Sequence, residues 1–560
     1  MTQPSLSQDL HWWQRGVVYQ IYPRSFKDTT GNGVGDLQGV IEKLDYLNDG
    51  STDPTSNDNP KSLGIDAIWL SPFYPSPMAD FGYDVADYCD IHPLFGNLDT
   101  FDQLVTEAHR RGIKIIIDYV PNHSSNQHPW FIESRSSRDN PKRTWYIWRD
   151  PKPDGGLPNN WGSVFGGPAW TWDETTGQYY LHQFLKEQPD LNWRKSEVRQ
   201  AMLEVLRFWM DRGVDGFRMD VIGKIIKDAE LRDNPPDPEA SPDLHPDDIF
   251  GRQLHLYNEE QDEVHEVIRV FRRLLDEYGD RCAIGELWCD LPRWVKYYGE
   301  KGDGLHLPFN FRLMSQPWEA EAIRRSVEQM EEALPTFAWP NYVLGSHDAQ
   351  RLATRIGSEQ ARVAAMLLLT LRGTPTLYYG DELGMENGVI PIEKMQDPQG
   401  LHFGPDRNRD VNRTPMQWND RPSAGFSITD SSTNETVEPW LPVSADFESR
   451  NVDAQSAEPT SMLNLYRRLL WYRRATPSLQ AGRYESVDAG GDDCFVYLRE
   501  HPTGKCLVAL NFADQSRTLS IPNMQSGSLA ISTYLDRTEA VSNSALSLRP
   551  NEGVIIRIES

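Results

Sequence analysis

Three acidic residues lie at or near the ends of short apolar segments: Asp220 in GFRMDV, Glu286 in GELW and Asp348 in GSHDAQR. A carboxylate nucleophile and a protonated carboxyl about 5–5.5 Å apart can cleave a glycosidic bond with retention of configuration. Neighbouring strands of a barrel supply such a spacing. A single acid at a strand end more often caps a helix. Three in equivalent positions, each among aromatic, His or Arg residues, favour chemistry instead.

The elements that must position these acids alternate between strand and helix patterns. Helical segments such as 101–111 and 198–212 separate the strands, which predicts βα units and a parallel sheet. An open doubly wound sheet would gather its site at one switch point. Here the polar residues follow strands three, four, five and seven, so we predict a (β/α)8 TIM barrel, an α/β fold. The predicted strands are 16–23, 67–72, 114–120, 213–221, 282–288, 305–311, 341–348 and 375–382.

Two segments interrupt or follow the barrel pattern. Residues 124–193, rich in Trp, Pro, Gly and Asn, are too long for an ordinary loop and predict an inserted subdomain after strand three. From 482 to 560 alternating strands without helices predict a C-terminal antiparallel β-sandwich domain. The catalytic barrel is then 1–123 and 194–481. The acidic, Pro-rich segment 227–247 is predicted to be a loop near the barrel mouth.

Composition excludes several classes of partner. Lys and Arg number 56 against 82 Asp and Glu, a formal charge of -26, which argues against nucleic acid and anionic membranes. The five cysteines are scattered and lack zinc spacing, as expected for thiols in a reducing compartment. No signal-peptide pattern and no membrane-length apolar run stand out. These features predict a cytoplasmic protein.

Seven motifs in a fixed order carry a family resemblance over nearly the whole chain. The sequence resembles glycoside hydrolase family 13, the α-amylase family, and within it the bacterial α-glucosidase and oligo-1,6-glucosidase branch. The motifs are GVVYQIYPRSF (16–26), DYVPNH (118–123), QPDLNW (188–193), GFRMDVI (216–222), GELW (285–288), SHDAQR (346–351) and GTPTLYYGDELGM (373–385).

The resemblance implies a role for each acid. Asp220 would be the nucleophile that forms a β-glucosyl-enzyme ester, and Glu286 the general acid and then the general base. Asp348 would hold the 2- and 3-hydroxyls of the sugar, whose hydrogen bonds strengthen in the transition state. Arg218, two residues before Asp220 on the same strand face, would pair with Asp220 and keep it ionised.

The resemblance also implies the shape of the sugar site. Tyr83 in DFGYDV would stack under the glucose ring, and His123 and His347 would hydrogen-bond the same sugar. Asp80 would pair with Arg413 to bind the 4- and 6-hydroxyls and close the site into a pocket. A closed pocket implies action on non-reducing ends.

Further substrate-site residues follow from the same resemblance. Phe165 and Phe184 match aromatic wall positions with Gln188 nearby, although plain packing explains these three equally well. Arg351, at the end of SHDAQR, is predicted to line the site. Val221 accompanies α-1,6 activity in the resembling enzymes, where Thr, Ala or Gly accompanies α-1,4 preference; a β-branched residue also suits a strand.

The loop DTTGNGVGD (28–36) places oxygen atoms at every second position. The resembling family often binds Ca2+ or Mg2+ here, and hard cations prefer oxygen ligands. The predicted ligands are Asp28, Thr30, Asn32, the Val34 carbonyl and Asp36. Thr30 and Asn32 replace the more usual Asn and Asp, so only two of the predicted ligands are carboxylates. The alternative is a Gly-rich turn that binds no cation. No cofactor is expected for catalysis.

We therefore predict a retaining, exo-acting α-glucosidase acting on small oligosaccharides of the maltose, isomaltose or sucrose type, with a lean to α-1,6 links. A transglucosylase or sucrose isomerase on the same scaffold is the alternative. RLATR (351–355) does not match the Arg-rich segment of sucrose isomerases, which favours hydrolysis. A non-enzymatic transporter subunit would have a membrane helix and degraded acids. Monomer and homodimer both remain open.

Overall fold

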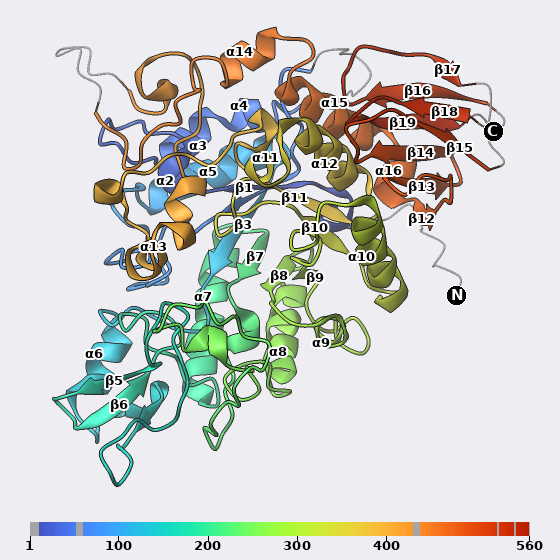
Figure 1. Cartoon of the computed structure of the whole chain (residues 1–560). Coiled ribbons are helices and arrows are strands. Elements are labelled where there is room, and N and C mark those ends of the chain that lie inside the picture. Colours follow the sequence, from blue (N-terminus) through green and yellow to red (C-terminus); the bar gives the residue numbers. More distant parts are fainter. Residues whose placement is uncertain (1–9, 52–59, 429–436, 523–525, 542–544, 559–560) are drawn as a thin grey trace.

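In a computed structural model of the chain, a central barrel carries a small domain at one end and a β-domain on its other side (Figure 1). The structure describes residues 10–51, 60–428, 437–522, 526–541 and 545–558. The outer limits of the predicted domains, 1 and 560, lie outside these ranges.

Eight parallel strands form the barrel, which confirms the predicted fold class. Their order in the sheet is β10-β11-β1-β2-β3-β7-β8-β9, so neighbours in space follow the chain apart from the three inserted strands. Each is short and buried, as expected when helices cover the outside. The strands are β1 (Val18–Ile21), β2 (Ala67–Leu70), β3 (Lys114–Tyr119), β7 (Gly216–Met219), β8 (Cys282–Glu286), β9 (Leu307–Phe309), β10 (Asn341–Val343) and β11 (Thr374–Tyr378).

Amphipathic helices surround this sheet. In α8 (Val264–Glu277), for example, Val264, Val267, Ile268, Phe271 and Leu275 are buried along one face at the spacing of a helix that packs on a core. Other helices begin with side-chain caps, such as Asn97 on α5. The longer helices around the barrel are α5 (Leu98–Arg110), α7 (Ser196–Asp211), α8, α10 (Ala320–Ala333), α12 (Ser358–Thr370) and α15 (Met462–Ala475).

The sheet order begins with β10 and ends with β9. Side-chain hydrogen bonds join these two strands and close the barrel. The buried Asn341 side chain accepts a hydrogen bond from the backbone N–H of Asn310 at 3.0 Å and donates another to the carbonyl of Pro308. Pro308 has no N–H to offer a ladder. An amide side chain thus completes the barrel where strand hydrogen bonds end.

The segment between β3 and α7 contains the small domain at the lower left of Figure 1. It consists of α6 (Pro129–Ser136) and an antiparallel sheet in the order β4-β6-β5 (Trp148–Arg149, Gln178–Leu181 and Trp170–Asp173). The loop after β7 is fastened to this domain, since Asn159 Nδ2 donates to Leu231 O at 3.0 Å and Trp161 Nε1 to Arg232 O at 2.9 Å. The two long insertions therefore form one wall over the same end of the barrel.

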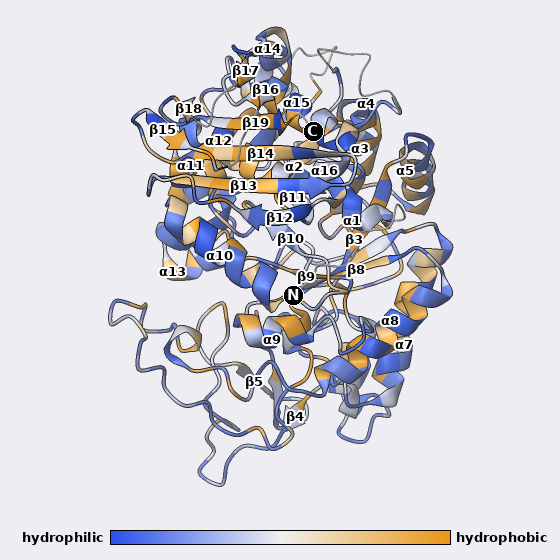
Figure 2. Cartoon of the chain, turned by 90° about the vertical axis from the view of Figure 1, so that its right-hand side faces the viewer, coloured by the Kyte–Doolittle hydropathy of each residue, from blue (hydrophilic) through white to orange (hydrophobic). Residues whose placement is uncertain are grey.

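Strands after residue 482 form two antiparallel sheets packed on a shared apolar layer, the predicted sandwich. Leu507, Leu519 and Val554 belong to that layer, and Figure 2 shows β13 and β14 apolar over much of their length. The larger sheet has the order β12-β13-β14-β19-β16-β17 (Arg483–Ser486, Cys494–His501, Gly504–Asn511, Gly553–Ile558, Gly527–Ser532, Ala540–Val541), and the smaller pairs β15 (Arg517–Ser520) with β18 (Ala545–Leu548).

Within the described ranges, no helix has the length and apolar character that crossing a membrane requires.

Replacing Asn341 by Leu tests the barrel junction. The change leaves the Asn310 N–H and the Pro308 carbonyl buried without partners, so we expect the free energy of unfolding to fall by about 2–4 kcal/mol. Urea denaturation followed by tryptophan fluorescence measures it. Thr106→Ala on the exposed face of α5 is the control and should change stability by less than about 0.5 kcal/mol. A stable Asn341→Leu variant would refute this role of the side chain.

Candidate active site

The three acids predicted from the sequence meet at the carboxyl end of the barrel. Asp220 follows β7 directly, Glu286 is the last residue of β8, and Asp348 lies in the loop after β10. They line one cavity of about 410 Å³. Side chains from β-strand ends and from both insertions complete its wall: Asp80, Tyr83, His123, Val164, Phe165, Phe184, Val221, Lys224, Phe250, His255, Glu259, Trp288, His347, Gln399 and Arg409.

One guanidinium connects three buried carboxylates below the cavity. Arg218 Nη1 donates to Asp220 Oδ1 at 2.6 Å and to Asp118 Oδ1 at 2.8 Å, and its Nη2 donates to Glu286 Oε2 at 2.6 Å. The predicted pairing of Arg218 with Asp220 is therefore present. The same guanidinium also orients Glu286, so Asp220 and Glu286 are both held by one planar, rigid group.

The turn after Asp220 holds Glu286 from a second direction. Val221 has left-handed backbone angles, φ 37° and ψ 45°, and its N–H donates to Glu286 Oε2 at 3.0 Å. Such a conformation costs a β-branched residue about 1–3 kcal/mol. The interpretation of Val221 as a strand residue is thus wrong: it lies in a strained turn that aims an N–H at the neighbouring acid. Trp288 Nε1 donates to the other carboxylate oxygen of Glu286 at 2.8 Å.

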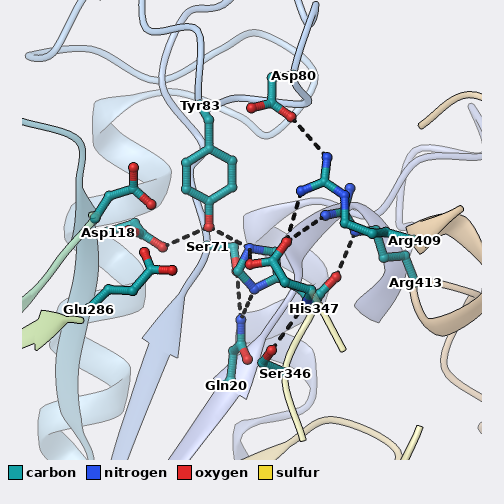
Figure 3. Close-up of polar contacts among 12 residues, drawn as sticks. Gln20, Ser71, Asp80, Tyr83, Asp118, Glu286, Ser346, His347, Arg409 and Arg413 are labelled. Atoms are coloured by element: carbon teal, nitrogen blue, oxygen red, sulfur yellow. Dashed lines mark hydrogen bonds and ion pairs between the residues drawn. The ribbon is translucent and has the colours of Figure 1, made fainter. Parts of the chain in front are cut away.

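Tyr83 and His347 form the floor of the cavity. Their rings lie 5.5 Å apart and parallel within 3°, and Tyr83 Oη is 2.7 Å from His347 Nε2. Gln20 contacts the other imidazole nitrogen at 2.8 Å, as Figure 3 shows. Tyr83 Oη also donates to Asp118 Oδ2 at 3.1 Å. This chain of hydrogen bonds ties the floor to the Arg218 cluster.

The opposite side of the cavity is built on two arginines. Arg409 Nη1 and Arg413 Nη2 both donate to Asp348 Oδ1, at 2.9 and 3.0 Å. Asp80 pairs with Arg409 at 3.3 Å (Figure 3), not with Arg413 as predicted. Arg413 lies behind the wall, where its Nε donates to the His347 carbonyl at 2.9 Å. The irregular turn that carries both arginines decides which one faces Asp80. Their separation of four residues in the sequence does not predict it.

The two sides of the cavity hold protons differently. Burial raises the pKa of Asp220 well above its usual range; Arg218 opposes that shift, while the carboxylates of Glu286 and Asp118 add to it. Burial likewise raises the pKa of Asp118 to about 6. One positive charge among three carboxylates therefore retains a shared proton near neutrality. Arg218 lowers the pKa of Asp220, in the direction expected from the sequence, but burial and the neighbouring carboxylates raise it.

Asp348 shows the reverse. Burial alone would raise the pKa of Asp348, but the adjacent guanidiniums of Arg409 and Arg413 outweigh it and hold that pKa well below its usual range. Desolvation lowers the pKa of His347 to about 3 and that of His123 to about 4. Both imidazoles are neutral at ordinary pH, so the guanidiniums supply the positive charge that keeps Asp348 ionised.

The remaining predicted residues divide between the cavity and its support. Phe165 and Phe184 face the cavity, and Phe184 lies 5.0 Å from the His123 ring. Gln188 is buried behind them and donates to Asp80 Oδ2 at 3.0 Å, with His123 Nε2 also at 3.0 Å. Its contacts make it a positioning residue for both.

Arg351 does not line the cavity, which contradicts its predicted role. Its guanidinium stacks on the rings of Tyr378 and Tyr379, donates to the Tyr379 carbonyl and lies 3.9 Å from Asp381. The side chain is fully buried and secures the end of β11. Its place within a motif indicated importance, but only the packing around it decides which way it points.

Several cavity residues escaped sequence reasoning. Arg409 lies four residues before Arg413, in RDVNR (409–413), and could have been named with it. Trp288 closes the GELW motif. The others come from the inserted domain, from the loop after β7 and from α13 (Pro398–Phe403), where composition carries no signal: Val164, Lys224, Phe250, His255, Glu259 and Gln399.

The loop predicted to hold a cation is closed by its own hydrogen bonds. Asp28 accepts from the backbone N–H groups of Thr30, Gly31 and Gly33 at 2.8–2.9 Å. Asp36 caps α3 (Leu37–Glu42). Asn32 Oδ1 accepts from the N–H of Val34 at 2.8 Å. These bonds hold the loop in a compact turn with its oxygen-bearing residues close together, and the cation site stays a prediction of the sequence.

Comparison with known proteins identifies the family. Residues 20–482 match the family model for the α-amylase catalytic domain. The chain is 41% identical to a probable α-glucosidase of Rhizobium meliloti over 538 residues, which is 93% of each chain. It is 37% identical to the oligo-1,6-glucosidase of Heyndrickxia coagulans, covering 98% of this chain and 99% of that protein.

Among solved structures, that of the α-glucosyl transfer enzyme XgtA superposes with a TM-score of 0.89 at 40% identity, over 98% of this chain and 100% of the other. This chain therefore belongs to the α-amylase family, glycoside hydrolase family 13, in its α-glucosidase branch, and it is a glycoside hydrolase.

Replacing Asp118 by Asn tests the shared proton. One fewer negative charge frees Arg218 for Asp220 and lowers the pKa of Asp220. An ionised Asp220 then survives to lower pH, so we expect the acid limb of kcat/KM for an α-glucoside to move down by about 0.5–1 pH unit. Asp215→Asn, at the opposite end of β7 and paired with His109 and Lys114, should leave that limb in place. An unmoved acid limb in Asp118→Asn would contradict the shared proton.

Proposed function

We propose that this enzyme is a retaining, exo-acting α-glucosidase that releases terminal glucose from short α-glucosides. Asp220 attacks the anomeric carbon while Glu286 donates its proton to the leaving oxygen, and Glu286 then activates water to hydrolyse the glucosyl ester. The observation that carries the proposal is the Arg218 fork, which holds both carboxyls at 2.6 Å on one rigid group.

Charge separation across the cavity supports these roles. Burial raises the pKa of Asp220 and of Asp118 in the Arg218 cluster, whereas Asp348 stays ionised between two guanidiniums. An ionised carboxylate accepts hydrogen bonds from sugar hydroxyls most strongly as positive charge develops on the ring. Tyr83 in the floor offers an apolar ring face to the sugar.

Exo-action is supported by the closed end of the cavity. Asp80, Arg409 and Gln188 are joined there by hydrogen bonds of 3.0–3.3 Å, and the Arg409 guanidinium lies over the Phe165 ring at 5.4 Å. A longer chain cannot pass through this end, so the non-reducing glucose would stop against it. Substrates of the maltose, isomaltose and sucrose type fit this geometry.

A lean to α-1,6 links is supported by Val221 and by the similarity to an oligo-1,6-glucosidase. A transglucosylase is the second candidate, because the similarity to an α-glucosyl transfer enzyme is equally broad. The two differ only in whether water or a sugar takes the glucosyl group from Asp220. A monomeric or homodimeric state and a cytoplasmic location remain predictions of the sequence.

The chemical proposal is tested by Asp220→Asn. The amide cannot form the glucosyl ester, so kcat for isomaltose should fall by about four orders of magnitude or more, with Asp215→Asn as the folded control. For the unmodified enzyme, NMR should show α-glucose as the first product. Initial release of β-glucose would refute retention. Oligosaccharides longer than the substrate, formed in place of glucose, would establish the transferase instead.

The linkage preference is tested by Val221→Thr. Thr is isosteric with Val but adds a hydroxyl beside the acceptor side of the cavity, so we expect the ratio of kcat/KM for maltose over isomaltose to rise about tenfold. Val164→Thr, elsewhere on the cavity wall, is the matched control and should leave the ratio unchanged. An equal change in both variants would remove Val221 as the determinant.

A further inference from the structure

A group of metal-ligating side chains lies on the rim of the barrel mouth, outside the cavity lining. His245, Asp247 and His402 each bring one possible ligand atom, and these atoms lie within 4.8 Å of one another. His402 Nε2 is 3.6 Å from Asp247 Oδ2, and the two imidazole rings lie 5.7 Å apart. Residues from the loop after β7 and from α13, about 155 positions apart in the chain, therefore lie close together.

The three residues come from segments that already meet. Gly167, in the inserted domain, donates its N–H to the Asp247 carbonyl at 2.7 Å. A Cβ on neighbouring Gly166 would overlap the His402 ring. Arg407 Nη2 pairs with Asp248 at 3.0 Å. The loop after β7, the segment that contains α13 and the inserted domain are therefore already in contact where the three ligand atoms lie.

The chemistry of the donors selects the ion. Two imidazoles and one carboxylate suit Zn2+ and its neighbours in the first transition row, whereas Ca2+ and Mg2+ prefer all-oxygen sites. Nearby cationic groups are engaged elsewhere: Arg252 donates to the carbonyls of Leu244, His245 and Asp248. Both His402 and Asp247 are partly exposed, at 39% and 59% of their side chains, so the ion has a direct path from solvent.

We propose that His245, Asp247 and His402 form a binding site for a zinc-type divalent ion that ties the three rim segments together. The site is separate from the sugar-binding residues but adjoins them. Phe250 and Gln399, which line the acceptor side of the cavity, lie three residues from Asp247 and from His402 along the chain. An ion here would limit the motion of both lining residues.

Calorimetric titration of chelator-treated enzyme with Zn2+ tests the site. We expect one ion per chain, with affinity reduced at least about tenfold in His402→Ala and in Asp247→Asn. His501→Ala, at an exposed imidazole in the C-terminal β-domain, should bind Zn2+ like the unmodified enzyme. Unchanged affinity in His402→Ala would overturn the proposal. So would loss of binding in Asp220→Asn with retention in His402→Ala, since the ion would then lie among the catalytic carboxylates.

Co2+ provides a second readout that does not depend on activity. Co2+ bound by imidazole and carboxylate should give visible absorption bands in the unmodified enzyme that are absent in His245→Ala. Circular dichroism of each variant without metal checks the fold. Because none of the three ligand residues is buried, we expect the circular dichroism spectrum of each metal-free variant to match that of the unmodified enzyme. Identical Co2+ bands in the unmodified enzyme and His245→Ala would overturn the assignment.

Discussion

The contact on which the active site most depends is the fork of Arg218 among Asp118, Asp220 and Glu286. Three carboxylates and one guanidinium are buried together at the end of the barrel. One positive charge cannot balance three negative charges. Removing Arg218 would leave three buried carboxylates without a positive partner, which is costly. The cluster therefore holds Asp220 and Glu286 in fixed positions on one guanidinium at the end of the barrel.

Asp348 completes this arrangement from the other side of the cavity. There two guanidiniums meet Asp348, and Arg409 also pairs with Asp80 and Asp397. Acids of similar intrinsic pKa are thus shifted in opposite directions by their surroundings: the pKa of Asp118 and of Asp220 is raised, and that of Asp348 is lowered. The neutral His347 and Tyr83 between them transmit position without adding charge.

The barrel explains why these groups can be placed so closely. Each strand ends at the same face, so residues distant in the chain arrive side by side, and rigid strands hold them better than loops would. The insertions after β3 and β7 then wall the cavity, joined to each other by the hydrogen bonds of Asn159 and Trp161. The side of the cavity with Asp220, Glu286 and Tyr83 is built close to strand ends, and the side with Phe184, Phe250 and His255 is built on these loops.

The sequence by itself determined the barrel, the family and the three acids, because strand periodicity is local and a strand end is readable from the residues around it. It also placed Arg218 beside Asp220, since residues two apart on a strand share a face. Only the tertiary structure decided that Arg409 and not Arg413 meets Asp80, that Arg351 points into the packing behind β11, and that Val221 adopts a left-handed turn. It likewise decided which residues of the loop after β7 face the cavity. These outcomes depend on contacts between segments far apart in the chain and on turn conformations that no local pattern specifies.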